Sequence, residues 1–453
     1  MNNQIQTPRD NAATGNNANA GRSAAKYGGG LFANAYGVSA RQAYERAAGL
    51  SVKNGTTLSV VSAAGGVTDL IISALGQASK KTQQYHDSFD QIYALHEGIY
   101  KTGTTDSMHK GLRAILQKTC SDGGCDEQTR AIAESYGERI SAYMFSKISG
   151  FTLIEPSEAG LISNQDSSFL NSTISIREGT ILNHGCQYVM GGYYATDREG
   201  HIRLTGRGGS DYTAAMVAAA IGASSLELWK NVDGVMSADP RLVQNTVLRP
   251  QLSFHEASAL AYYGMKIIHP RAPEAVRGRG ISFNVRNFYS ESGSIGTQIL
   301  ENKTTNGFTI AYKQDISRID VSSEDMASNP GYASRIFSLM ADAGISVDII
   351  STSQTSISFT IKRENSEAAF STLEKNQIGT TTLNPNASLM TIIADNVDFA
   401  TLTSKTFGAI SSAGISGVDA ISKGSNLDEL NIVTREDLLQ PLMQAVHDGL
   451  LRK

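Results

Sequence analysis

The sequence predicts an α/β protein, in which helices sandwich a mainly parallel sheet, followed by two small α+β units. Up to about residue 300, buried strands alternate with glycine turns and helices, as in a parallel sheet covered on both faces. Beyond that point, an amphipathic helix, a glycine and an apolar strand occur twice, at 333–351 and at 403–422. We therefore expect a main domain at 24–302 and two tail domains, at 303–384 and 385–453.

Length and composition narrow the class of protein. A chain of 453 residues exceeds what one hydrophobic core usually serves, and a net charge of −4 offers no basic field for nucleic acid or anionic lipid. Its three cysteines lack CxxC spacing, so we expect neither a disulfide framework nor a zinc site, and we expect a cytoplasmic location. No apolar run approaches the ~20 residues that span a bilayer, so no membrane partner is expected. Residues 1–23 are rich in Asn, Ala and Gly and predict a disordered leader.

The first ordered segments contain two glycine turns. Lys26 and the glycines at 28–30 can bring an ammonium group and backbone N–H groups to one polyphosphate, although a flexible end to the leader is the alternative. After a helix at 39–50, a strand at 57–63 runs into a second glycine turn and a helix at 64–72. That order places ligands at the carboxyl ends of a sheet's strands.

The middle of the chain holds the strongest motif. A helical stretch at 79–143 has one break around 120–125, and its Glu138, taken alone, is typical of a solvated helix charge. After expected strands at 151–159 and 187–194 comes the octet GRGGSDYT at 206–213, followed by an Ala-rich helix that Ser210 or Asp211 is expected to cap.

Free N–H groups at the start of that helix suit a phosphate or carboxylate. Arg207 adds a fork that can bind a carboxylate through two hydrogen bonds. Because glycine turns alone are weak evidence, an ordinary capped loop is the alternative. A further strand is expected at 226–229.

Three segments together resemble the aspartate kinase family: the octet, residues 229–241, and the sequence GMKIIHP at 264–270. The resemblance runs from about Lys26 to the C-terminus, and the repeated tail is similar to that family's paired ACT domains, which are ferredoxin-like and bind amino acids. It implies transfer of the ATP γ-phosphate to the β-carboxylate of L-aspartate, giving 4-phospho-L-aspartate, the first step of aspartate-family amino-acid biosynthesis. It also implies ATP and Mg²⁺ as cofactors and a homodimer or homotetramer formed through the ACT-like domains.

The resemblance assigns a role to each site residue. The implied catalytic residues are Lys26, Asp211 and Lys266. The implied aspartate-binding residues are Thr68, Glu138, Arg207 and Ser210. The implied ATP-binding residues are Lys26, Gly28, Gly29, Lys230, Asn231, Gly234, Arg241 and Lys266. In this scheme Arg207 clamps a carboxylate of the substrate, Glu138 takes its α-ammonium, and two lysines neutralise the transferred phosphate; no residue is assigned as a metal ligand.

The chain departs from the family at two places. Gly30 and Leu31 replace a Thr-Ser pair, so two hydroxyls near the phosphates are missing. Lys230 and Asn231 replace a Thr-Asp pair, so a cation is added and a carboxylate becomes an amide. The retained residues favour an active, specialised enzyme. Two other functions stay open: a kinase for another acidic amino acid, and a catalytically weak or silent amino-acid sensor.

The first tail unit holds the expected effector pocket, between 326–333 and 346–354. Its expected residues are Met326, Asn329, Gly331, Ser346, Asp348 and Gln354. Asp348 can accept an effector's ammonium, and the turn at 329–331 can offer N–H groups to its carboxylate. The resemblance implies lysine as the inhibitor and threonine as the runner-up, although Gln354 replaces the glutamate of lysine-sensitive relatives. The alternative is that Asp348 only caps a strand end.

Overall fold

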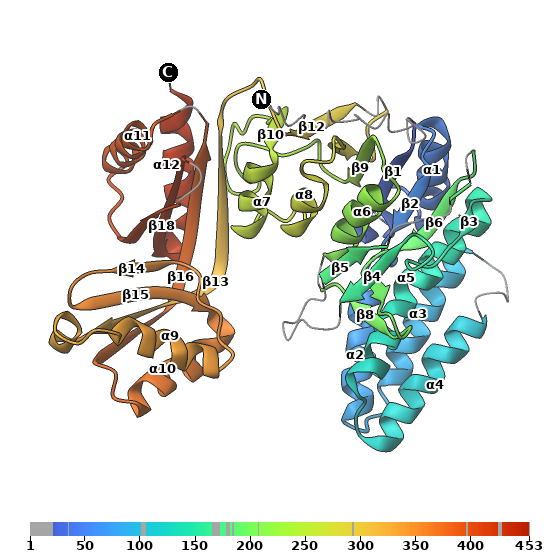
Figure 1. Ribbon diagram of the computed structural model, residues 1–453, viewed down its shortest axis with the longest axis horizontal. Coiled ribbons are helices and arrows are strands. Elements are labelled where there is room, and N and C mark those ends of the chain that lie inside the picture. The colour runs from blue at the N-terminus through green and yellow to red at the C-terminus, as the bar shows by residue number, and fades with distance from the viewer. Residues whose placement is uncertain are drawn as a thin grey trace, which may run out of the picture.

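The computed structural model describes residues 21–34, 36–100, 106–164, 173–177, 182–183, 185–206, 208–291, 294–395, 397–424 and 428–452. In Figure 1 the main domain lies on the right and the tail on the left, with α7 (Phe254–Tyr262) and α8 (Arg271–Val276) between them. Most of the expected leader lies outside the described residues, and Ser23 already belongs to the first strand.

The main sheet has eight strands in the order β10-β12-β11-β9-β1-β2-β6-β3. Their bounds are β1 (Ser23–Tyr27), β2 (Leu58–Val61), β3 (Thr152–Leu153), β6 (Tyr188–Gly191), β9 (Ser225–Lys230), β10 (Gln251–Ser253), β11 (Ser282–Asn287) and β12 (Ile295–Leu300). All neighbouring strands are parallel except β11 and β12, which confirms the predicted sheet type. The carboxyl ends of β1, β2 and β9 therefore meet at the middle of one sheet edge.

Helices cover both faces of this sheet, as expected. One face packs against α1 (Ala40–Lys53), α2 (Val67–Ser79) and α5 (Glu127–Ser149), and the other against α6 (Gly209–Ala220), α7 and α8. Two further helices, α3 (Tyr85–Ile99) and α4 (Asp106–Asp122), pack on α2. Along β1 the side chains alternate: Ala24 joins the core under α6, and Ala25 and Tyr27 join the opposite core. Lys26 consequently points toward α6. The predicted single break in the helical stretch was incomplete, because α3 also ends at Ile99.

Two of the expected strands differ from the prediction. The strand expected at 151–159 contains only the two residues of β3, and the one at 187–194 divides between β6 and β7 (Tyr194–Thr196). A small second sheet, β5-β4-β7-β8, consists of β4 (Leu161–Asn164), β5 (Thr173–Ile176), β7 and β8 (Ile202–Leu204). It packs against α5 and α6 beside the main sheet.

The tail forms one antiparallel sheet of six strands, in the order β14-β15-β13-β16-β18-β17. Its elements are β13 (Phe308–Ser322), α9 (Tyr332–Asp342), β14 (Ile350–Thr352), β15 (Ser356–Lys362), α10 (Ser366–Lys375), β16 (Thr380–Ala394), α11 (Phe399–Ser412), β17 (Val418–Lys423), β18 (Asp428–Arg435) and α12 (Leu439–Leu451). The two α+β units are present, with one core under α9 and α10 and another under α11 and α12.

The long strands β13 and β16 each serve both units of the tail. Residues 316–322 pair with β15 in the first unit, while 308–313 pair with 389–394 in the second. The first unit is thus inserted into the second, and the boundary expected between 384 and 385 falls inside β16. Among the described residues no helix is long and apolar enough to cross a membrane, and Cys120, Cys125 and Cys186 are all unpaired.

Candidate functional site

A cavity of about 370 Å³ lies where β1, β2 and β9 end. It brings together many of the predicted site residues: Lys26, Gly29, Thr68, Glu138, Ser210, Asp211, Lys230 and Lys266. These residues come from segments as far apart in the chain as β1 and the loop after α7. The parallel sheet joins them because its strand ends share one edge.

A buried carboxylate shared by two lysines forms the floor of the site. The Lys26 Nζ lies 2.8 Å from the Asp211 Oδ1, and the Lys230 Nζ lies 3.0 and 2.8 Å from the two carboxylate oxygens. Lys26 aligns with Leu228 across the β1–β9 pair, so Lys230, two residues later, points to the same face. Burial alone would raise the pKa of Asp211, but the charges of Lys230 and Lys26 outweigh it and lower that pKa.

Burial also acts on Lys230 and lowers the pKa of its ammonium to about 8, with Asp211 opposing the shift and Lys26 adding to it. The cluster therefore carries more positive than negative charge in a site shielded from water. A cavity of this kind favours an anion with several charges.

Glycine turns line the cavity at two helix starts. Gly66 precedes α2 with φ 85° and Gly208 precedes α6 with φ 75°, both in the left-handed region that favours glycine. The expected cap by Ser210 or Asp211 was wrong, because both residues lie inside the first turn of α6. With the cap formed by glycine, the Ser210 hydroxyl and the Asp211 carboxylate point into the site instead.

Glu138 on α5 is buried at the other side of the cavity, so the interpretation as a solvated charge was wrong. Its Oε2 makes no hydrogen bond with the described residues. Burial raises the pKa of this carboxyl to about 8, partly offset by the backbone of Ala63 and by Lys26. Because buried polar atoms normally have a hydrogen-bond partner, this free oxygen can accept a hydrogen bond from a bound cation.

The remaining predicted nucleotide residues lie outside this cavity. The Gly28 backbone lies beside the Lys26 ammonium, and the Asn231 amide donates to the Tyr36 hydroxyl. Arg241 is exposed and paired with a neighbouring carboxylate, and Gly234 packs against β12. Arg207 falls outside the described residues.

Sequence reasoning missed two residues of the site. Asp69 lines the cavity beside Thr68 in the first turn of α2. Its position directly after the glycine turn at 64–66 could have identified it as a site residue. Tyr193 lines it with φ 69° and donates through its hydroxyl to Glu134 at 2.6 Å. Nothing in the sequence distinguishes Tyr193 from its tyrosine neighbour.

Among the described residues that line the cavity, no three metal-ligand side chains lie close enough together to hold an ion. Asp211 is occupied by two lysines, and burial raises the pKa of Glu138. Elsewhere in the described parts of the chain, one group of three metal-ligand types, Asp197, Glu199 and His201, lies together on the β7–β8 turn. Arg203 already pairs with Asp197 there.

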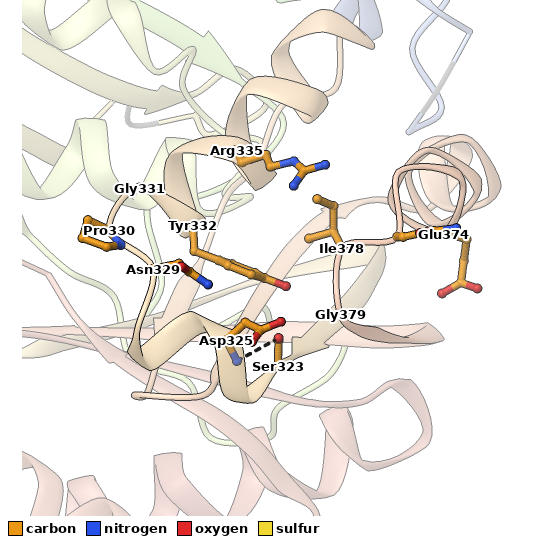
Figure 2. A pocket seen from close by; sticks show the side chains of 11 residues that line it. Ser323, Asp325, Asn329, Pro330, Gly331, Tyr332, Arg335, Glu374, Ile378 and Gly379 are labelled. Carbon is orange, nitrogen blue, oxygen red and sulfur yellow. Dashed lines mark hydrogen bonds between the residues drawn. The ribbon is translucent and has the colours of Figure 1, made fainter.

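The tail contains a larger cavity, of about 590 Å³, between the start of α9 and the turn after α10. Asn329 and Gly331, two of the predicted effector residues, line it. In Figure 2 Arg335 lies on one side, Asp325 on the other, and the Tyr332 ring between them. The other predicted effector residues, Met326, Ser346, Asp348 and Gln354, are not among its lining residues.

The single effector pocket expected from the sequence is thus divided. Asp348 lies instead at the junction with the main domain, where its carboxylate is 3.0 Å from the Lys313 Nζ. This also corrects the alternative that Asp348 only caps a strand end, because its side chain bridges two parts of the chain.

Comparison with known families agrees with this architecture. The amino acid kinase family matches residues 22–287, and an ACT domain matches 319–377. The chain therefore belongs to the amino acid kinase family.

Relatives within that family are named aspartokinases. The chain is 31% identical over 363 residues to a bifunctional aspartokinase/homoserine dehydrogenase of Haemophilus influenzae, covering 75% of this chain and 44% of that protein. It is 27% identical over 381 residues to the chloroplastic aspartokinase 2 of Arabidopsis thaliana, covering 78% and 70%. The chain thus spans less than half the length of the first of these relatives.

Solved structures show the same fold. E. coli aspartokinase III in complex with aspartate and ADP matches with a TM-score of 0.80 at 20% identity, over 95% of this chain and 100% of that one. Clostridium acetobutylicum aspartate kinase matches with a TM-score of 0.75 at 20% identity, over 94% and 100%. Both structural matches include the tail as well as the main domain, which supports the division of the chain into these two parts.

Proposed function

We propose that the chain is an aspartate kinase, which transfers the γ-phosphoryl group of ATP to the β-carboxylate of L-aspartate. The observation that carries the proposal is that one cavity contains both positively charged groups for a phosphate and a buried carboxyl group for an ammonium. Lys26 and Lys230 on Asp211 suit a phosphate, and the buried Glu138 oxygen suits an ammonium. The aspartokinase names of the relatives support the same substrate, and so does the E. coli enzyme solved with aspartate and ADP.

The reaction needs little covalent help from the protein. A β-carboxylate oxygen forms a bond to the γ-phosphorus, the bond from that phosphorus to the β–γ bridging oxygen breaks, and ADP leaves. The attacking carboxylate is already ionised, so no proton has to be removed. Positioning and charge neutralisation remain, and Lys26 and Lys266 supply the positive charge that the transition state needs. Asp211 then acts by holding Lys26 in place.

The amino acid is held at the Glu138 side of the cavity. Its α-ammonium donates to Glu138, and the hydroxyls of Thr68 and Ser210 lie in reach of its carboxylates. We assign Arg207 to a substrate carboxylate on the strength of the family resemblance alone.

The nucleotide occupies the side formed by the end of β9. Its phosphates meet Gly28, Gly29 and Lys230, and its nucleoside extends toward the segment that contains Asn231, Gly234 and Arg241. We assign Mg²⁺ to the nucleotide phosphates, whose negative charge it would neutralise.

The test is acyl-phosphate formation. Purified protein receives ATP, Mg²⁺ and single amino acids, and hydroxylamine traps the product as a hydroxamate. Aspartate-dependent hydroxamate is expected from the unaltered chain. The signal should be lost in Lys26→Met and should be unchanged in Lys110→Met, a control at an exposed lysine. Hydroxamate with glutamate only would select a kinase for another acidic amino acid. No turnover together with calorimetric amino-acid binding would select a sensor.

We also propose that the tail takes an amino-acid effector and joins copies of the chain. Lysine is the expected effector and threonine the runner-up; a solved E. coli aspartokinase III contains lysine and aspartate, and its fold is similar. The short edge strands β14 and β17 leave backbone groups for pairing with another copy, which supports a homodimer or homotetramer.

A further inference from the structure

We infer that the tail positions the active-site residue Lys266 through a clasp formed by Tyr262, Lys313 and Asp348. The inference deepens the proposed function, because it rests on Lys266 as a nucleotide-binding lysine. These three residues are positioning residues that touch neither substrate. They lie in α7, in the part of β13 that belongs to the second tail unit, and just before β14 in the first, so they connect the main domain with both tail units.

The segment that carries Lys266 is short and begins at the clasp. Tyr262 is the last residue of α7, and the chain passes through Tyr263 and Gly264 before Lys266 reaches the cavity. Three residues, at 263–265, separate the tyrosine from the lysine. A change in the direction of this segment therefore moves the ammonium that faces the phosphate.

Three interactions hold the clasp. The Lys313 Nζ lies 3.0 Å from the Asp348 Oδ2, and the Tyr262 hydroxyl donates to the Asp348 Oδ1 at 3.3 Å. The Lys313 ammonium also lies 4.5 Å from the centroid of the Tyr262 ring. The Lys313 and Asp348 side chains are about four-fifths buried, at 21% and 19% exposure, so water screens this pair less than a surface pair.

The segment that carries Lys266 also contacts the backbone of β13, the strand that contains Lys313. Gly264 has φ 106°, and a Cβ at this position would overlap the carbonyl oxygen of Tyr312, the residue before Lys313. The pairing of β13 with β16 shifts register between Lys313 and Ile316, as at a bulge. Bulges redirect side chains, and here the irregularity occurs where the two tail units meet and where Lys313 turns toward α7.

The clasp is not needed to keep the tail docked. A separate ionic cluster joins the two parts: Arg249 pairs with Glu256 and with Asp395, which directly follows β16, and Lys303 pairs with both of these carboxylates. His447 of α12 also shares a hydrogen bond of 2.8 Å with Ser237. Opening the clasp should therefore leave the domains together and free only the segment that carries Lys266.

The clasp also defines what an effector must do. An amino acid whose ammonium binds Asp348 has to displace the Lys313 ammonium, which already occupies it. Such a ligand would release Tyr262 and, through it, the Lys266 segment. A ligand shifts this equilibrium only by the difference in its affinity for the two arrangements.

The experiment measures ADP and aspartate binding to the full chain by calorimetry. Lys313→Met and Tyr262→Phe are expected to weaken ADP binding by about tenfold and about threefold, within the range of couplings carried by packed networks. Aspartate affinity and the melting temperature should stay unchanged. Lys313→Arg should restore ADP binding, and the control Lys362→Met, whose pair with Glu364 lies on the exposed surface of the same tail, should have no effect.

A double variant separates positioning from a structural role. If Lys313 acts through Lys266, Lys266→Ala with Lys313→Met binds ADP no more weakly than Lys266→Ala alone. Additive losses, unchanged ADP binding in Lys313→Met, or an equal loss for both ligands with a lower melting temperature would each overturn the inference. The hydroxamate assay of the unaltered chain reports the proposed function independently, so the two failures can be told apart.

Discussion

Raising the pH from 6 to 8 should strengthen L-aspartate binding by about fiftyfold, through the ionisation of Glu138. Burial raises the pKa of Glu138 to about 8, and the carboxyl must lose its proton before it can accept the substrate's ammonium. Affinity therefore rises with pH below the pKa and levels off above it. The gain is ~9-fold from pH 6 to 7 and ~5-fold from pH 7 to 8, equivalent in total to ~2.3 kcal/mol.

The assay is calorimetric titration of aspartate at constant ionic strength, without nucleotide. ADP binding provides an internal contrast of opposite sign, because the Lys230 ammonium, with its pKa lowered to about 8, loses its charge as the pH rises through that value. ADP affinity should thus be highest below pH 8 and fall above it. Glu138→Gln should bind aspartate weakly and with no pH dependence, whereas Glu127→Gln, on the exposed start of the same helix, should behave as the unaltered chain. A flat profile for the unaltered chain, or a slope that survives in Glu138→Gln, would refute the assignment.

Three further variants test the phosphate side of the site. Lys26→Ala should keep the fold and lower kcat by ~10²–10³, the usual cost of losing a transition-state donor, and a variant that retained a tenth of the activity would disprove the role. Gly29→Ala should lower kcat more than the melting temperature, because a Cβ there would overlap the carbonyl oxygen of Ala63 at the cavity wall; unchanged kcat would contradict this. Lys230→Met leaves Asp211 with one ammonium, so ADP binding should weaken ~10-fold and lose its decline above pH 8, as titration across that pH would show.

The parts of the site that the sequence predicts are those fixed by local chain geometry. Lys26 precedes three glycines, and Asp211 follows a glycine turn at the start of a helix, so both were expected beside a bound anion before their partners were known. The bidentate contact of Lys230 with Asp211 depends on the register of β9 against β1, which no local pattern encodes.

The predictions were wrong where the environment of a residue depends on packing between distant segments of the chain. Glu138 lies on α5, whose middle is buried on nearly every side, so a charge that is typical of a solvated face became part of the site. Asp348 had a reasonable role as an effector ligand until Lys313, 35 residues earlier, was found to occupy it. The internal repeat correctly predicted two tail units, but pattern alone could not reveal that β13 and β16 run through both.

The insertion of one tail unit into the other also sets an order of events during synthesis. The first unit is complete once Ala387, which pairs with Ile316, has left the ribosome. Residues 308–313 instead wait for β18 and for α12, which ends at Leu451, before their own unit can close. Domains generally fold as they emerge, so the inner unit should form first and hold the two ends of the outer one side by side. The folded inner unit would thus hold the outer parts of β13 and β16 in place for β18 and β17 to pair with.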